Sequence, residues 1–83
     1  MKDTVVIEFR IAKCDQSYDL VVPLHITANE LVSALNTAFN LQIDMSNIKN
    51  CYLKAEKPIA LLRGNKTLAE YGIRNGSVIN YTL

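Results

Sequence analysis

The chain contains one histidine and two cysteines, the residue types that most often supply nucleophiles, general bases and metal ligands. Cys14 lies in a predicted hairpin turn and His25 follows the second predicted strand. A strand rises about 3.3 Å per residue, so the two side chains should lie on the order of 20–30 Å apart. The spacing of Cys51 and His25 leaves that pair open, but no third group is indicated that would orient it. We therefore expect no catalytic residue and no enzymatic activity.

Cys14 is then expected to be an exposed thiol and Cys51 a small hydrophobic residue of a strand. A metal site is not indicated, because the sequence has neither a Cys-x-x-Cys motif nor a pair of histidines at ligand spacing. We expect no metal and no cofactor.

Charged residues are distributed unevenly, although the formal net charge is only +1. Residues 1–48 hold three basic and six acidic residues, whereas residues 49–83 hold six basic and two acidic ones. The small net charge argues against nucleic-acid binding, which generally needs a strongly basic face. The basic half has two interpretations. It is a solvated surface, or Lys54, Lys57 and Arg63 form a cluster that docks an acidic protein partner or an anionic membrane face.

Length and composition predict one folded domain, residues 1–83. Hydrophobic residues make up 49% of the chain, enough to form a core, and two cysteines cannot make the disulfide framework of a small secreted domain. The longest apolar stretch without a charge, residues 31–43, is shorter than the ~20 residues that span a bilayer. The first residues carry acids and bases where a signal peptide would be apolar. We expect a cytoplasmic protein without stable membrane insertion.

Alternating hydrophobicity predicts a β-hairpin at the start of the chain. Apolar residues occupy every second position in residues 5–11, the period of a half-buried strand. Residues 12–17 supply a polar turn, and alternation resumes at Tyr18, Leu20 and Val22. Pro23 lacks a backbone donor and should close the second strand or mark an edge.

A helix should begin at Thr27, because Thr27 and Glu30 have the spacing of a capping box. It should end near Asn40 or Leu41. The apolar positions recur at the spacing of one buried stripe: Ala28, Leu31, Val32, Leu35, Ala38 and Phe39. The opposite face has no charge at all: Ser33, Asn36, Thr37 and Asn40. That face reflects chance residue usage, or it is a contact surface for a partner or for a weak homodimer.

The rest of the chain predicts three further strands and one short turn of helix. The strands are expected at residues 48–57, 59–62 and 77–83, and the helical turn at residues 67–71. The Asn75-Gly76 pair marks a turn before the last strand. That strand carries no charge, which places it inside the sheet and not at its edge. The order β-β-α-β-β-turn-β predicts an α+β fold in which one helix lies across a mixed sheet of four to five strands.

Residues 67–73, Thr-Leu-Ala-Glu-Tyr-Gly-Ile, resemble the segment before the last strand of ubiquitin. The resemblance implies a ubiquitin-like β-grasp fold in which Leu68 and Ile73 fill the core under the helix and the Tyr71 hydroxyl bonds a nearby backbone group. The sequence ends without the Gly-Gly tail through which ubiquitin and the sulfur carriers are activated, so conjugation is not expected. Asn80 and Thr82 take the places of the His and Val of ubiquitin's recognition patch, and ordinary ubiquitin-binding domains are therefore not expected to dock.

Tyr18-Asp19-Leu20 opening the second strand, Val22-Pro23 closing it and the Asn-Gly turn resemble the YukD/EsaB family. These are ubiquitin-like components of type VII (WXG100) secretion systems of Gram-positive bacteria. The resemblance implies a non-catalytic adaptor or regulatory protein, with membrane-associated subunits or an ATPase of that machinery as partners. Two alternatives remain. One is a generic β-grasp interaction module that adds a strand at its sheet edge, and the other is a modifier or sulfur carrier whose tail is missing.

Overall fold

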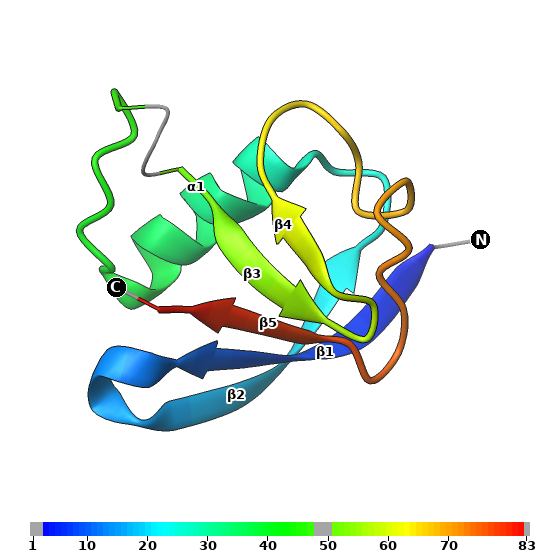
Figure 1. The fold of residues 1–83 in the computed structure, drawn as a ribbon, viewed down its shortest axis with the longest axis horizontal. Coiled ribbons are helices and arrows are strands. Elements are labelled where there is room, and N and C mark those ends of the chain that lie inside the picture. The colour runs from blue at the N-terminus through cyan, green and yellow to red at the C-terminus, as the bar shows by residue number, and fades with distance from the viewer. Residues whose placement is uncertain (1–2, 48–50, 83) are drawn as a thin grey trace.

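A five-stranded mixed sheet and one helix form the fold of the computed structural model, which describes residues 3–47 and 51–82. The strand order is β2-β1-β5-β3-β4, with β5 parallel to β1 and the other neighbours antiparallel (Figure 1). The strands are β1 Thr4–Ile11, β2 Gln16–Pro23, β3 Leu53–Glu56, β4 Ala60–Leu62 and β5 Val78–Tyr81. The predicted mixed sheet, and the predicted place of the uncharged last strand in its centre, are confirmed.

The boundaries of four strands differ from the sequence expectation. A short 3₁₀ turn, Ala12–Cys14, replaces most of the expected 12–17 turn, so that β2 begins at Gln16. The third strand is Leu53–Glu56 and not 48–57, of which residues 48–50 lie outside the described residues. Lys57 has a positive φ of 59°, which ends β3 and moves Ile59 into the turn before β4. The last strand ends at Tyr81, and Leu83 lies outside the described residues.

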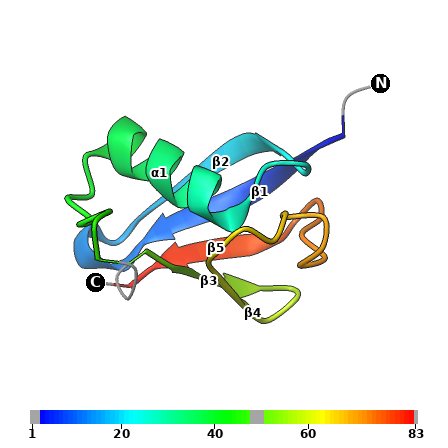
Figure 2. The ribbon, with the colours of Figure 1, turned by 90° about the horizontal axis from the view of Figure 1, so that it is seen from above.

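The helix α1, Ala28–Phe39, lies across one face of the sheet (Figure 2). Its start is the predicted capping box: Glu30 N–H donates to Thr27 Oγ1, and Thr27 N–H donates to the Glu30 carboxylate. The next two orphan donors are also satisfied, because Ala28 N–H donates to the Lys66 carbonyl and Asn29 N–H to the Gly64 carbonyl. The loop before β5 therefore closes the helix N-terminus. The helix ends at Asn40, which takes a left-handed conformation.

The core lies between α1 and the inner face of the sheet. The alternation in β1 is confirmed, since Val5, Ile7, Phe9 and Ile11 are all buried. From the helix, Ala28, Leu31, Val32 and Leu35 are buried against them, whereas Ala38 is exposed, contrary to the predicted stripe. The Phe39 ring closes the far end of the core, 5.1 Å from the Phe9 ring and 4.9 Å from the Tyr18 ring. The described residues include no helix long and apolar enough to cross a membrane.

The segment that resembles ubiquitin packs as expected. Leu68 and Ile73 are buried in the core. Between them the chain makes one turn, in which Tyr71 N–H donates to the Thr67 carbonyl. The Tyr71 hydroxyl donates to the Arg63 carbonyl at 2.7 Å, and Arg63 N–H donates to the same hydroxyl at 3.3 Å. The turn is thereby tied to the end of β4.

Candidate functional site

The residues with reactive side chains come from three different parts of the fold. Cys14 is exposed in the 3₁₀ turn, and His25 is exposed between β2 and α1. Cys51 is buried, with its Sγ 3.4 Å from the Asn47 carbonyl oxygen. The exposure of Cys14 and the burial of Cys51 match the expectation, but Cys51 precedes β3 and is not a strand residue as predicted. Within residues 3–47 and 51–82, no three His, Cys, Asp or Glu side chains are grouped so that they could hold a metal ion.

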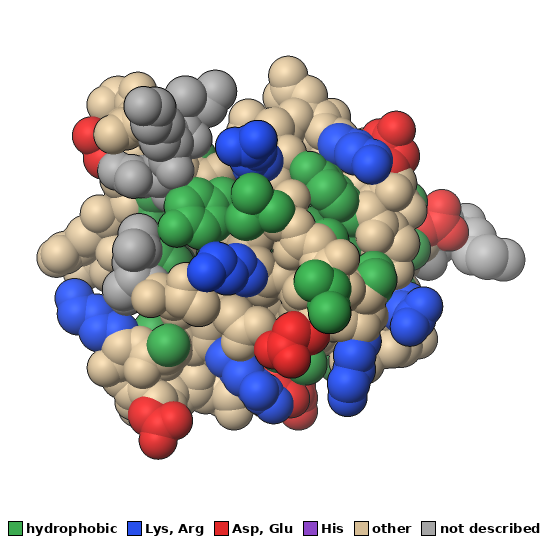
Figure 3. Space-filling model, viewed as in Figure 1, with side chains coloured by type: hydrophobic (Ala, Val, Ile, Leu, Met, Phe, Trp, Pro, Cys, Tyr) green, Lys and Arg blue, Asp and Glu red, His purple; other side chains and the backbone are tan. Residues whose placement is uncertain are grey.

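The sheet face opposite α1, here called the outer face, carries the side chains that alternate with the core residues (Figure 3). The strand register aligns five of them in one row across the sheet: Ser17, Arg10, Asn80, Lys54 and Leu61. A parallel row two residues along holds three acids, Asp19, Glu8 and Glu56, with Val78 among them. The row that contains Arg10 and Lys54 therefore runs beside the acidic row across the middle of the outer face.

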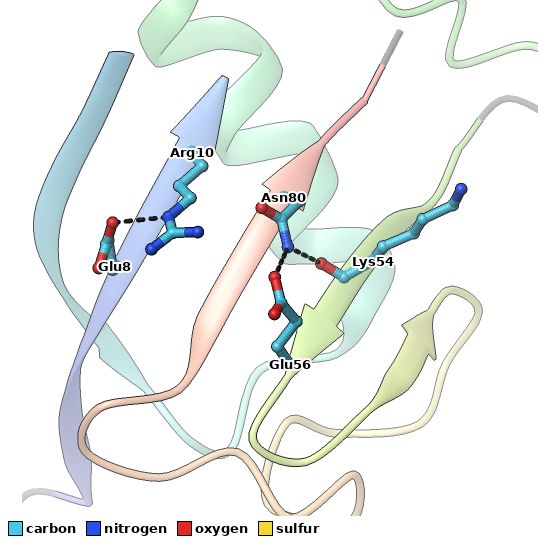
Figure 4. Close-up of polar contacts among 5 residues, drawn as sticks. All are labelled: Glu8, Arg10, Lys54, Glu56 and Asn80. Atoms are coloured by element: carbon cyan, nitrogen blue, oxygen red, sulfur yellow. Dashed lines mark hydrogen bonds and ion pairs between the residues drawn. The ribbon is translucent and has the colours of Figure 1, made fainter. Parts of the chain in front are cut away.

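Two polar contacts link these rows (Figure 4). The Arg10 Nε donates to the Glu8 carboxylate at 2.7 Å, and this contact raises the pKa of the Arg10 guanidinium. The Asn80 amide donates to the Glu56 carboxylate at 2.9 Å and to the Lys54 carbonyl at 3.4 Å, so Asn80 joins β5 to β3. The Lys54 ammonium group has no ion pair among the described residues.

An open hollow of about 640 Å³ lies on the outer face over β5, β3 and β4. Its lining is mostly apolar, and the residues that line it are Lys54, Ala55, Glu56, Ile59, Ala60, Leu61, Asn80 and Thr82. Ile59 is 92% exposed and Leu61 43% exposed, so two aliphatic side chains stand at its margin in contact with solvent. Figure 3 shows hydrophobic side chains over this part of the sheet with basic side chains around them. We call this feature the outer-face hollow.

The three basic residues singled out in the sequence are not equally placed. Lys54 lines the outer-face hollow, whereas Lys57 is exposed in the β3–β4 turn and Arg63 is exposed directly after β4. In the β3–β4 register Arg63 falls opposite residue 52, five residues from Lys57 along the hairpin. At ~3.3 Å per residue, their backbones lie on the order of 17 Å apart. The three cations are thus spread along the hairpin and do not form one compact cluster.

Ile59 and Leu61 were not singled out from the sequence. The signal was present, because residues 59–62 are all apolar. A three-residue strand with one buried face needs apolar side chains only at alternate positions, so some of these four had to face outward.

The second surface expected from the sequence, the uncharged face of α1, is only partly exposed. Ser33, Thr37 and Asn40 are exposed, but Asn36 is half-buried. Its Oδ1 accepts from Ile43 N–H at 2.9 Å and its Nδ2 donates to the Ile43 carbonyl at 3.2 Å. The placement of Asn36 on the exposed face of the helix is corrected, because this side chain is half-buried and holds the loop after the helix.

Comparison with protein families decides the assignment. The model of the family described as "WXG100 protein secretion system (Wss), protein YukD" matches residues 6–80. The chain belongs to the YukD family. The match covers the helix and all or most of every strand, and the family resemblance stated from the short motifs is confirmed. The comparison with curated proteins gave no match.

Solved structures show the same ubiquitin-like fold. A ubiquitin-like domain of tubulin-binding cofactor B has a TM-score of 0.74 at 18% identity, over 96% of this chain and 89% of that one. The C-terminal ubiquitin-like domain of mouse tubulin-specific chaperone e has a TM-score of 0.70 at 13% identity, over 95% and 84%. The ubiquitin-like domain of Plasmodium falciparum Dsk2 has a TM-score of 0.61 at 14% identity, over 93% and 96%. At these identities the likeness shows the β-grasp fold alone.

Proposed function

We propose that this YukD family member is a cytoplasmic, non-catalytic adaptor or regulatory component of a Gram-positive type VII secretion system, and that it binds a protein partner non-covalently through the outer-face hollow. Family membership supports the link to WXG100 secretion. The exposure of Ile59 at 92% carries the choice of surface. Covering a large, water-exposed aliphatic side chain at the margin of a hollow gives a partner a large favourable free energy of burial.

The lining of the hollow supports a partner with an apolar surface and a carboxylate. Full burial of an isoleucine or leucine side chain contributes about 1.5–3 kcal/mol, so a partner that covers both Ile59 and Leu61 gains several kcal/mol. A carboxylate of the partner next to Lys54 would complete the contact, because the Glu56 carboxylate already accepts from Asn80. Lys57 and Arg63, at the two ends of the hairpin, would accelerate encounter with an acidic surface in a salt-sensitive way.

In-cell crosslinking from a photoreactive residue at position 61, followed by identification of the captured protein, tests the proposal. We expect a subunit of the secretion machinery. Ile59→Ser together with Leu61→Ser should abolish capture from a second photoreactive position, 82, and reduce export of the WXG100 substrate. Ile59 is 92% exposed, so its replacement should change the free energy of unfolding by less than about 0.5 kcal/mol, whereas Leu61 is 43% exposed and its replacement should cost about 1 kcal/mol.

Charge reversal at Lys54, Lys57 and Arg63 to Glu provides the electrostatic arm, and Thr37→Glu on the opposite side of the molecule is its matched control. Unchanged capture and export in the reversal variant would exclude the acidic partner. If the variant with serine at both Ile59 and Leu61 retains capture and export, the hollow is not the binding surface. A covalent adduct at Leu83, seen by mass spectrometry, would favour a modifier or carrier over an adaptor.

A further inference from the structure

The strand β2 forms one edge of the sheet along its whole length. It pairs with β1 on one side, and Figure 1 shows none of the described chain on its other side. It has eight residues, whereas β4, the strand at the other edge, has three. A long edge strand offers a row of backbone donors and acceptors to any extended chain.

Hydrogen bonds beside β2 fix which backbone groups point outward. Leu24 N–H donates to the Asp3 carbonyl, and on the other side of β1, Glu8 N–H donates to the Ser77 carbonyl. In an antiparallel pair, residues that exchange hydrogen bonds alternate with residues that do not. In this register the backbone N–H and C=O groups of the even-numbered residues of β2 point toward β1. The N–H and C=O groups of Ser17, Asp19 and Val21 therefore point away from the sheet.

Natural edges are usually protected by lysines, bulges, prolines or short length. Residues 16–22 contain no lysine and no proline, and their register with β1 runs unbroken from Ile11 to Thr4. Pro23 stands at the very end of the strand. The middle of β2 is thus open to strand pairing.

Apolar side chains flank this edge on both faces of the sheet. On the outer face Val21 is 67% exposed, and its cross-strand neighbour Val6 is 46% exposed. On the inner face Tyr18 is 37% exposed and packs against the Phe39 ring at the end of α1. A strand placed beside β2 would cover apolar surface with alternate side chains on each face.

Charge distinguishes the possible occupants. Asp19 is the one charged residue in β2, and it has no ion pair among the described residues. A second copy paired about a two-fold axis, in the register that uses all three outward residues, would set Asp19 opposite Asp19 of that copy. Like charges directly opposite each other are destabilising. The edge instead suits a strand that carries a basic residue at the position facing Asp19.

We propose that β2 binds an extended segment of another protein as a sixth, edge strand, with a Lys or Arg facing Asp19 and an aliphatic residue facing Val21. The main chain of that segment supplies the hydrogen bonds, and the alternating side chains supply the selectivity. This surface is at the opposite edge of the sheet from the outer-face hollow, so the inference goes beyond the proposed function and does not rest on it.

The test uses a synthetic peptide, acetyl-Lys-Val-Ile-Lys-Val-Thr-Arg-amide, titrated into the ¹⁵N-labelled full chain. When the peptide is aligned antiparallel to β2, its central lysine faces Asp19 and the valine at its second position faces Val21. We expect the largest amide shift changes at Ser17, Asp19 and Val21. N-methylation of the central lysine removes a donor aimed at β2 and should weaken binding at least about fivefold. N-methylation of the valine directly after the central lysine is the matched control. The N–H of that valine points away from β2, so its methylation should weaken binding less than about twofold.

Asp19→Lys should weaken binding of the lysine peptide about fivefold, and a peptide with glutamate in the central position should restore it. Leu61→Lys, at the far edge, should leave peptide binding unchanged whatever its effect on the hollow. Three results would overturn the proposal: no shift changes at about 5 mM peptide, equal effects of the two N-methyl groups, or concentration-dependent shifts in β2 without peptide. The last would identify a second copy as the occupant.

Discussion

Replacement of Asn36 by alanine should destabilise the fold, although the residue lies on the polar side of an amphipathic helix. Both polar atoms of its amide are bonded to Ile43, whose own side chain is buried at 8% exposure. The same loop is held at a second point, where the Tyr81 hydroxyl donates to the Leu41 carbonyl. Asn36→Ala therefore removes both side-chain hydrogen bonds from α1 to this loop and leaves the contact from Tyr81 of β5.

The size of the effect follows from two opposing contributions. Each hydrogen bond contributes a net ~1 kcal/mol, and both Ile43 partners are partly buried, so their loss costs about 2 kcal/mol. Alanine is the better helix former by roughly 0.6 kcal/mol, which offsets part of this. We expect a loss of about 1.5 kcal/mol in the free energy of unfolding. For a chain of this length, such a loss lowers the melting temperature by roughly 6–12 °C.

Urea denaturation followed by far-ultraviolet circular dichroism measures this difference. Thr37→Ala is the matched control, because Thr37 is exposed on the next position of the same helix and should be neutral or slightly stabilised. Asn36→Asp keeps the acceptor for Ile43 N–H but loses the donor, and it should fall between wild type and Asn36→Ala. If Asn36→Ala and Thr37→Ala unfold at the same urea concentration, the two bonds to Ile43 contribute nothing and the reasoning is refuted.

Two further predictions concern acid stability and the turn before β5. The backbone N–H of Thr27 donates to Glu30 and that of Thr67 to Glu70, and these bonds lower the pKa of both carboxyls. Their stabilising effect is present above the ordinary glutamate pKa and is lost as the pH falls through the lower folded value. Glu30→Gln with Glu70→Gln keeps the caps and should make the urea midpoint depend less on pH between ~5 and ~2; an equally steep dependence would contradict this. Tyr71→Phe removes the hydroxyl bonded to Arg63 and should cost about 1 kcal/mol, with amide shift changes confined to residues near Arg63; a change spread over the whole sheet would show a different role.

Local patterns predicted most of the fold. The Thr27 capping box and the alternation of β1 are short-range signals, and both are present in the structure as the sequence indicated. The central place of β5 also followed from the sequence, because a strand without charges is poorly suited to an edge. These features depend on a few neighbouring residues and on one solvation argument.

The candidate site was harder to predict, because it depends on register between distant residues. In the run 59–62 every side chain is apolar, so the sequence cannot say which of them faces solvent. The pairing of Lys54 with Leu61 puts Leu61 on the outer face, and the turn at Lys57 leaves Ile59 exposed. Asn36 was misjudged for a similar reason, since its partner Ile43 reaches it only through the path of the loop.

The two proposed surfaces differ in the physics of recognition. The outer-face hollow offers side chains over β5, β3 and β4, whereas β2 offers backbone donors and acceptors at its free edge. The near margin of the hollow, at β5, is two strand spacings of ~4.8 Å from β2 and its far margin, at β4, is four, so the hollow lies on the order of 10–19 Å from the free edge. A strand added at β2 extends the sheet away from the hollow, and a side chain held in the hollow does not reach β2. The two proposed surfaces do not overlap, so the proposed adaptor could hold one protein at β2 while a second binds at the hollow. The width of the five-stranded sheet provides this separation.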